Sequence, residues 1–494
     1  MKVLKQNVIY VSFFNNILKK IFFLFVTLFS LTISDRFYAQ VILLFILSNY
    51  VYEIVSLSIP KVFNNYLKIY NSKKLSILSG FNLYLSSLMI FIILLLSCFF
   101  NNFEINNSVF SDNYFILGFV LLGFSVALND LIDKYNYLKF NHLYIYYYDI
   151  LEIIISSLAI LLIFFGYTGL IEEQVFLIIF VFSIVKFIFS VIKLIIFRKD
   201  IELNFKQILT IINFEDFKNL TKLVIPIFLI SILFLLQFTI SRFIILYIED
   251  YSTFSIFAFH NQIIELCSLF FLSLHQLSGP KISYLFRNKK KKMLLILQNK
   301  LLAISYTVTP VLLFTLYFLA NDIINILDLN ISFNNFLFII LSFNFFVIYL
   351  FLTMYQHMIM QNETKFLLVI MFITILMNFF LSLTLTYFYS LIGLALANLV
   401  SNIFLLLICN NRTNFFFFRK SEKKSLVLLI FRISIIIYIS NIWDFTSISE
   451  SDIKIFIVKL TLILVLFIGS EMLMSKKYRI YFLFDKLIKT INYR

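Results

Sequence analysis

The chain has 494 residues, of which 61% are hydrophobic and 14% are charged, and its mean hydropathy is +0.96. This composition excludes a soluble globular domain. The net charge of +15 does not indicate nucleic-acid binding, because the basic residues lie in short loops beside apolar stretches. In that position they set membrane topology and contact anionic lipid headgroups.

Fourteen stretches of about 20 apolar residues follow one another, each long enough to cross the ~30 Å hydrocarbon core as an α-helix. They are 11–33, 39–59, 75–99, 114–133, 143–166, 170–197, 222–247, 252–277, 299–320, 334–357, 365–387, 389–410, 425–443 and 453–474. A closed β-barrel would need alternating apolar and polar residues, which these stretches lack. We therefore predict an all-α polytopic membrane protein with about 14 transmembrane helices.

Basic residues gather at both termini and in every second loop. The other loops are acidic, with Arg36 as the main exception, and their acids are Glu104, Asp112, Glu172, Glu173, Glu249, Asp250, Asp322, Asp328, Asp444, Glu450 and Asp452. Basic residues stay on the cytoplasmic side during insertion. The alternation therefore predicts an even number of spans, two cytoplasmic termini and a periplasmic loop near Asn106.

Enzyme motifs are absent from the sequence. With only 8 glycines, the chain contains no GxxxxGK[ST] and no GxGxxG, and neither HExxH nor GxSxG occurs. The four histidines do not lie at metal-ligand spacings. Cys98, Cys267 and Cys409 fall inside expected spans, as small core residues would. We expect no catalytic residue, no cofactor and no metal.

Short similarities indicate an internal repeat. Residues 31–37 read LTISDRF and residues 238–243 read FTISRF, while Pro60-Lys61 and Pro280-Lys281 close the second and eighth spans. Six spans separate the equivalents, so the halves would be parallel repeats with a substrate path between them. The expected domains are a lobe of helices 1–6 at 1–197, a cytoplasmic linker with an amphipathic helix at 198–221, a second lobe of helices 7–12 at 222–410, and helices 13–14 with a basic tail at 411–494.

Local sequence in the second half carries a family resemblance. The seventh span opens Leu223-Val-Ile-Pro226 and closes around Arg242, the eighth ends in Gly279-Pro280, and the twelfth begins LIGLALAN at residues 391–398. With fourteen spans, these features make the chain similar to Wzx-type O-antigen flippases of the multidrug/oligosaccharidyl-lipid/polysaccharide exporter superfamily. Ser241 stands where an Asp commonly precedes the arginine, so the sequence does not support an ion pair at Arg242.

The resemblance implies a function and partners. The substrate would be an oligosaccharide repeat unit on undecaprenyl diphosphate. It would be moved from the cytoplasmic to the periplasmic leaflet of the bacterial inner (cytoplasmic) membrane by ion-coupled alternating access. Its sugars and diphosphate cannot cross hydrocarbon unaided, because each unpaired polar group costs several kcal/mol there. The implied partners are this lipid-linked oligosaccharide, membrane lipids, and a polysaccharide polymerase with its chain-length regulator. No nucleic acid is implied.

Polar residues inside the spans are the candidates for substrate binding. Lys186, Lys193 and Arg242 could meet the diphosphate, although a base near a helix end can also snorkel to the interface. Gln237 and Asn378 suit sugar hydroxyls or plain interhelical hydrogen bonding equally well.

Four acids inside the spans are the candidates for ion coupling. They are Glu53, Asp149, Glu152 and Glu265. Asp149 and Glu152 share a helix face and could instead pair with Lys186. Glu265 lies near the middle of its span, which makes it the preferred coupling residue.

Other functions compete with this interpretation. A lipid II flippase would carry a related diphosphate lipid. A multidrug or organic-cation antiporter of the same fold would favour acids and aromatics over intramembrane bases. An O-antigen polymerase would need a large outer loop, and the expected outer loops hardly exceed a dozen residues. Glycosyltransferase genes beside this one would distinguish the first function from the others.

Overall fold

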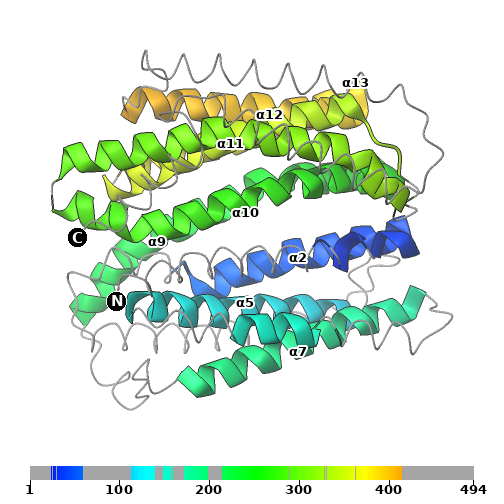
Figure 1. Cartoon of the computed structure of the whole chain (residues 1–494), viewed down its shortest axis with the longest axis horizontal. Coiled ribbons are helices and arrows are strands. Elements are labelled where there is room, and N and C mark those ends of the chain that lie inside the picture. The colour runs from blue at the N-terminus through cyan, green and yellow to red at the C-terminus, as the bar shows by residue number, and fades with distance from the viewer. Residues whose placement is uncertain are drawn as a thin grey trace, which may run out of the picture. The chain divides into compact units, whose positions relative to one another are not determined.

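The structure is a computed structural model that describes residues 24, 26–28, 30–58, 113–139, 148–156, 158, 172–197, 214–288, 290–326, 329, 331–361 and 363–413. These residues form long α-helices and no strand (Figure 1). The all-α polytopic fold is therefore confirmed. The expected spans 75–99, 425–443 and 453–474 lie outside the described residues, as do most of 11–33 and 143–166. The count of 14 thus stays a prediction.

The chain divides into two compact units, Met1–Thr239 and Ile240–Arg494. Helix α9 (Phe214–Ile248) contributes to both, and it accommodates Pro226 within its first half. Residues 214–221 of the expected linker already belong to this helix, while the amphipathic segment before it lies outside the described residues. The division into two six-helix lobes stays a prediction.

In the first unit, helix α2 (Asp35–Ser56) packs on α5 (Asn113–Lys139), which packs on α7 (Glu172–Phe197) (Figure 1). The Ser34 side chain caps α2 by accepting a hydrogen bond from the Phe37 N–H at 3.1 Å, which explains the break between the first two expected spans. A Cβ at Gly123 of α5 would lie 2.6 Å from the Ser48 carbonyl oxygen of α2. The missing side chain is therefore what lets these two helices approach so closely.

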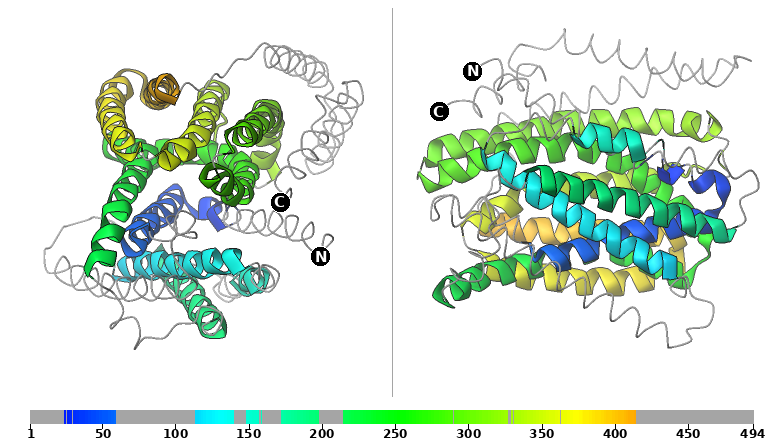
Figure 2. Two further views of the ribbon diagram at one scale, coloured as in Figure 1. Left: turned by 90° about the vertical axis from the view of Figure 1, so that its left-hand side faces the viewer. Right: turned by 90° about the horizontal axis from the view of Figure 1, so that it is seen from below.

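In the second unit, α10 (Tyr251–Arg287), α11 (Lys291–Ile326) and α12 (Asn335–Met360) pack against one another, and α12 also packs on α13 (Thr364–Thr413) (Figures 1 and 2). Helix α11 continues through position 310, where the sequence has a proline. Helix α13 is broken at Ser390, with φ of 48° and ψ of −128°. This break agrees with the expected boundary between the spans 365–387 and 389–410.

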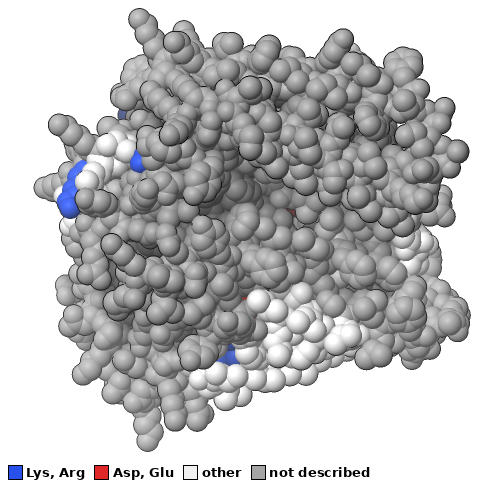
Figure 3. All heavy atoms as spheres, in the orientation of Figure 1, with Lys and Arg blue, Asp and Glu red and all other residues white. Residues whose placement is uncertain are grey.

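Six of the described helical segments are long and apolar enough to cross a membrane: Asp35–Ser56, Ile116–Asp133, Phe180–Phe197, Val224–Ile248, Asn335–Ile359 and Thr364–Arg412. The last contains the break and corresponds to two expected spans. Where the described residues reach the face in Figure 3, their surface is mostly uncharged. The apolar stretches of the sequence and the long apolar helices of the structure both indicate a multi-pass membrane protein.

Candidate functional site

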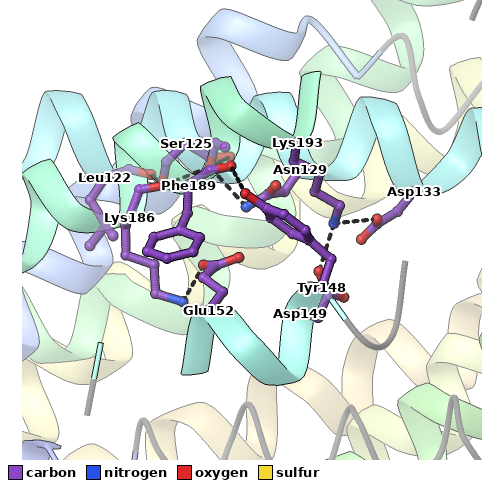
Figure 4. Close-up of polar contacts among 11 residues, drawn as sticks. Leu122, Ser125, Asn129, Asp133, Tyr148, Asp149, Glu152, Lys186, Phe189 and Lys193 are labelled. Atoms are coloured by element: carbon purple, nitrogen blue, oxygen red, sulfur yellow. Dashed lines mark hydrogen bonds and ion pairs between the residues drawn. The ribbon is translucent and has the colours of Figure 1, made fainter. Parts of the chain in front are cut away.

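A polar face on α7 meets two neighbouring helical segments (Figure 4). Lys186, Ser190 and Lys193 lie four and three residues apart, so they share one side of α7. Ser190 accepts a hydrogen bond from Asn129 of α5 at 2.9 Å and donates one to the Ser125 carbonyl at 3.2 Å. These contacts help to fix the register between α5 and α7.

Lys193 is held between two aspartates. Its Nζ donates to Asp149 Oδ1 at 2.6 Å and to Asp133 Oδ1 at 2.7 Å, and its side chain has 0% exposed surface. Asp133 comes from α5 and Asp149 from the helical segment 148–156 (Figure 4). The ammonium group of Lys193 therefore ends among carboxylates inside the protein.

Lys186 pairs with Glu152 at 2.6 Å, and its ammonium lies 5.9 Å from the ring centre of Phe182. Of the pairing expected for Lys186, this contact confirms the part with Glu152, whereas Asp149 is bound to Lys193 instead. Asp133 was missed by the sequence interpretation. The sequence does contain a signal for Asp133. It is an acid at the cytoplasmic end of one expected span, and Lys193, its partner, is a base inside another expected span that needs an acid.

Arg242 and Glu265 form the ion pair of the second unit. Arg242 Nη2 donates to Glu265 Oε1 at 2.7 Å, joining α9 to α10. The side chains are 15% and 38% exposed, in contrast to Lys193 and Asp149. One candidate for substrate binding, Arg242, thus contacts the preferred candidate for ion coupling, Glu265, which sequence spacing did not predict. An ion pair at Arg242, which the sequence did not support, is therefore present, with an acid 23 residues further along the chain.

Glu53 and Gln237 are both buried. Glu53 Oε2 accepts a hydrogen bond from the Ser58 hydroxyl at 2.9 Å, at the end of α2. Near these residues, the Tyr52 hydroxyl donates to Asp130 of α5 at 2.7 Å, and the Tyr50 hydroxyl lies 2.6 Å from Thr239 Oγ1 of α9. The tyrosines of α2 therefore tie both neighbours to it.

Asn378 belongs to an amide cluster within α13. Its Nδ2 donates to Asn398 Oδ1 at 3.0 Å across the break, and its Oδ1 accepts from Ser382 at 3.1 Å. One turn beyond Asn398, Asn402 donates to Asn344 of α12 at 2.7 Å. Of the two roles that the sequence left open for Asn378, interhelical hydrogen bonding is the one present here.

His260 is also tied to a helix end. Its Nε2 accepts a hydrogen bond from the Asn334 N–H at 3.0 Å, so its Nδ1 carries the proton and donates to the Ile256 carbonyl at 2.7 Å. The ring stacks on Phe333, with centroids 4.9 Å apart. This arrangement fixes the start of α12 against α10 and is structural.

Contacts at the helix ends join segments of the same expected side. The Ser390 hydroxyl donates to Glu249 at 2.8 Å. Glu249 lies in an expected outer loop, and Ser390 lies at the expected outer end of the span 389–410. Arg412 pairs with Glu363 at 3.2 Å, and both lie in expected cytoplasmic loops. Asp250 caps α10, and hydrogen bonds from Thr253 lower the pKa of its carboxyl group. The charge alternation is thus consistent with the packing of the second unit.

Among the described residues, no three His, Cys, Asp or Glu side chains form a group that could hold a metal ion. The two cysteines in this part of the chain, Cys267 and Cys409, are buried free thiols. The charged pairs described above can act by ionic chemistry. It consists of binding an anion at the bases, or a proton or cation at the acids.

No family model matches the chain, and no curated protein matches it in sequence. Solved structures do match its fold. A mutant of the Vibrio cholerae MATE transporter VcmN aligns over 82% of this chain and 94% of its own, with TM-score 0.60 and 12% identity. A transporter of the MOP superfamily from Pyrococcus furiosus aligns over 82% and 95%, with TM-score 0.58 and 11% identity.

The lipid II flippase MurJ in an inward closed conformation aligns over 95% of this chain and 97% of its own, with TM-score 0.58 and 16% identity. At these identities the likeness shows the fold alone. These three solved proteins are described as two transporters and a flippase. The chain therefore shares the fold of these solved membrane proteins.

Proposed function

We propose that the protein is a flippase that moves undecaprenyl-diphosphate-linked oligosaccharide units from the cytoplasmic to the periplasmic leaflet by alternating access. The single observation that carries this proposal is the Arg242–Glu265 ion pair, which lies in two helices of a transporter fold and keeps part of its surface exposed. A charged pair within expected spans is costly to maintain and marks a functional site by default. Its exposure leaves the guanidinium within reach of a ligand.

The pair couples the substrate to an ion by exchange. A planar guanidinium binds phosphate oxygens in the same bidentate manner as it binds a carboxylate. An incoming diphosphate therefore competes with Glu265 for Arg242. Once displaced, the Glu265 carboxylate has lost its counter-charge, and a proton or Na⁺ would neutralise it. When the headgroup leaves, Arg242 pairs with Glu265 again, and Glu265 releases its proton or Na⁺.

Lys186 offers a second, weaker site of the same kind. It is 17% exposed and bound to Glu152, which is almost fully buried. Lys193 and Asp149 are closed on all sides, so we assign them to structure and not to substrate exchange. In this scheme a polysaccharide polymerase with its chain-length regulator receives the flipped unit on the outer side.

A lipid II flippase is the second candidate. The MurJ structure aligns over 95% of this chain, whereas the two transporter structures align over 82%. Both substrates would present a diphosphate to Arg242, so the exchange scheme is the same. An organic-cation antiporter is less favoured, because Glu265 is occupied by an arginine that would repel the cation.

Transport by purified protein tests the proposal. The purified protein would be placed in proteoliposomes with a fluorescent undecaprenyl-diphosphate oligosaccharide or, in a second arm, with fluorescent lipid II. A membrane-impermeant quencher removes the fluorescence of lipids in the outer leaflet only. The fraction of fluorescence lost over time therefore measures flipping. We expect flipping of the oligosaccharide lipid that depends on an imposed ion gradient. Flipping of lipid II alone selects the second candidate, and flipping of neither, with uptake of an organic cation, overturns both.

A further inference from the structure

The first half of α13 presents one continuous exposed stripe. Its exposed residues recur every three or four positions, as one side of a helix requires. They are Lys365, Val369, Phe372, Ile373, Leu376, Phe379, Phe380, Thr384 and Tyr387. All between the two ends are apolar except Thr384, whose hydroxyl donates to the Phe380 carbonyl at 3.0 Å. A hydroxyl satisfied by its own helix can face hydrocarbon without an unpaired polar group.

The stripe has the length of a bilayer core. Lys365 and Tyr387 are 22 positions apart, which at 1.5 Å per residue is about 33 Å along the helix. The hydrocarbon layer is about 30 Å thick. A lysine at one end can extend into the headgroups, and a tyrosine at the other prefers the interface because its ring is amphipathic. The length of the stripe and the residues at its two ends therefore indicate where the hydrocarbon layer would lie along α13.

An aromatic turn follows the stripe. Tyr387, Phe388 and Tyr389 are 79%, 73% and 62% exposed, and Tyr247 near the end of α9 is 89% exposed. The hydrogen bond from Ser390 to Glu249 joins the two chain segments that carry these rings. Ser390 has a positive φ of 48°, a conformation that costs a non-glycine residue about 1–3 kcal/mol. The surrounding contacts therefore hold this turn in one specific shape.

We propose that Tyr247 and Tyr387–Tyr389 form an aromatic anchor in the phospholipid headgroup layer, at the end of the second unit away from Lys365. The partner is the lipid interface itself, because the aromatic turn continues a lipid-length apolar stripe on the same helix. The rings hold that end at a fixed depth. This inference does not depend on which substrate the protein carries.

Depth-dependent fluorescence quenching tests the anchor. The only native tryptophan would be removed by Trp443→Phe, and single reporters introduced as Tyr387→Trp, Tyr389→Trp and, as the matched control in the middle of the stripe, Leu376→Trp. Protein in phosphatidylethanolamine/phosphatidylglycerol vesicles would be quenched by lipids with a nitroxide near the headgroup end or near the methyl end of the acyl chain. Two reporter positions at the turn guard against one variant that fails to fold.

We expect the ratio of shallow to deep quenching to exceed one at positions 387 and 389 and to fall below one at position 376. Equal ratios at all three positions would overturn the proposal. So would reporters at 387 and 389 that respond only to aqueous iodide. A saturable change on adding soluble oligosaccharide, without lipid quenching, would instead assign the rings to sugar stacking.

Discussion

Lys193 Nζ lies 2.6 Å from Asp149 Oδ1, and the two side chains are 0% and 1% exposed. Asp133 approaches the same ammonium group at 2.7 Å, so two acids from different helical segments share one base. This cluster joins α5, α7 and the segment 148–156 at a single point. Breaking a buried ion pair leaves an uncompensated charge, which costs about 3–5 kcal/mol, more than most packing defects on the surface.

Removing that base should destabilise the protein strongly. In Lys193→Met two carboxylates lose their shared counter-charge, and we expect a lower midpoint of thermal unfolding and a lower yield in detergent. Fluorescence-detected size-exclusion after heating measures both. Lys365→Met, at an exposed position, is the matched control and should behave like the native chain. The triple variant that adds Asp133→Asn and Asp149→Asn to Lys193→Met should regain much of the lost midpoint temperature of unfolding. A triple variant no more stable than Lys193→Met alone would contradict the charge argument.

The Arg242–Glu265 pair should respond differently. The reciprocal exchange Arg242→Glu with Glu265→Arg rebuilds the ion pair, so we expect near-native thermal stability. Flipping should nevertheless be lost, because the base that meets the diphosphate has moved to another helix. Arg242→Lys should retain partial activity and Arg242→Ala should lose most of it at equal expression. Native flipping by the exchanged variant would make the pair structural only.

Variants of Lys186 can show whether this base binds the substrate headgroup or only forms an ion pair with Glu152. Because Lys186 is partly exposed and paired with Glu152, Lys186→Ala should reduce flipping if the headgroup also contacts this base. Lys186→Arg should keep partial flipping, since the charge remains. The matched comparison is Lys186→Ala with Glu152→Gln, which removes both charges. If this double variant flips at the native rate, Lys186 contributes only the ion pair.

Hydropathy and charge alternation predicted much of the fold. The break at Ser34 and the division of α13 near residue 388 both fell at the expected places, because a cap and a non-helical turn interrupt the apolar pattern visibly. Helix ends were less predictable. Helix α9 begins at Phe214 and α11 at Lys291, before the expected spans, because a helix continues past the hydrocarbon without a change in backbone geometry.

The ion-pair partners were only partly predictable. The pairing of Glu152 with Lys186 followed from charge inside the expected spans, whereas Asp133 with Lys193 and Glu265 with Arg242 required the three-dimensional packing. Composition identifies which residues need a partner in a membrane, because an unpaired charge is costly there. It does not rank the available partners, since helices far apart in sequence can face each other in any order.

Two glycines should tolerate no side chain. A Cβ at Gly123 would lie 2.6 Å from the Ser48 carbonyl oxygen, and one at Gly393 would lie 1.9 Å from the Leu385 carbonyl oxygen. Because both obstacles are backbone atoms, Gly123→Ala should separate α2 from α5 and Gly393→Ala should disrupt the turn in α13. Thermal unfolding in detergent measures both losses. Val126→Ala, at an exposed site on α5, is the control and should change the midpoint little.

The orientation of the helices can be tested with single cysteines. In a chain with Cys98, Cys267 and Cys409 replaced by alanine, Asp250→Cys should react with a membrane-impermeant maleimide in intact cells, because Asp250 lies in an expected periplasmic loop. Glu363→Cys should react only after the membrane is permeabilised, since its contact with Arg412 joins two expected cytoplasmic segments. Labelling of both positions in permeabilised cells is the control for accessibility. The reverse pattern, with Glu363→Cys labelled from outside and Asp250→Cys protected, would invert the topology and place the bases of every second loop in the periplasm, against the rule that retains them in the cytoplasm.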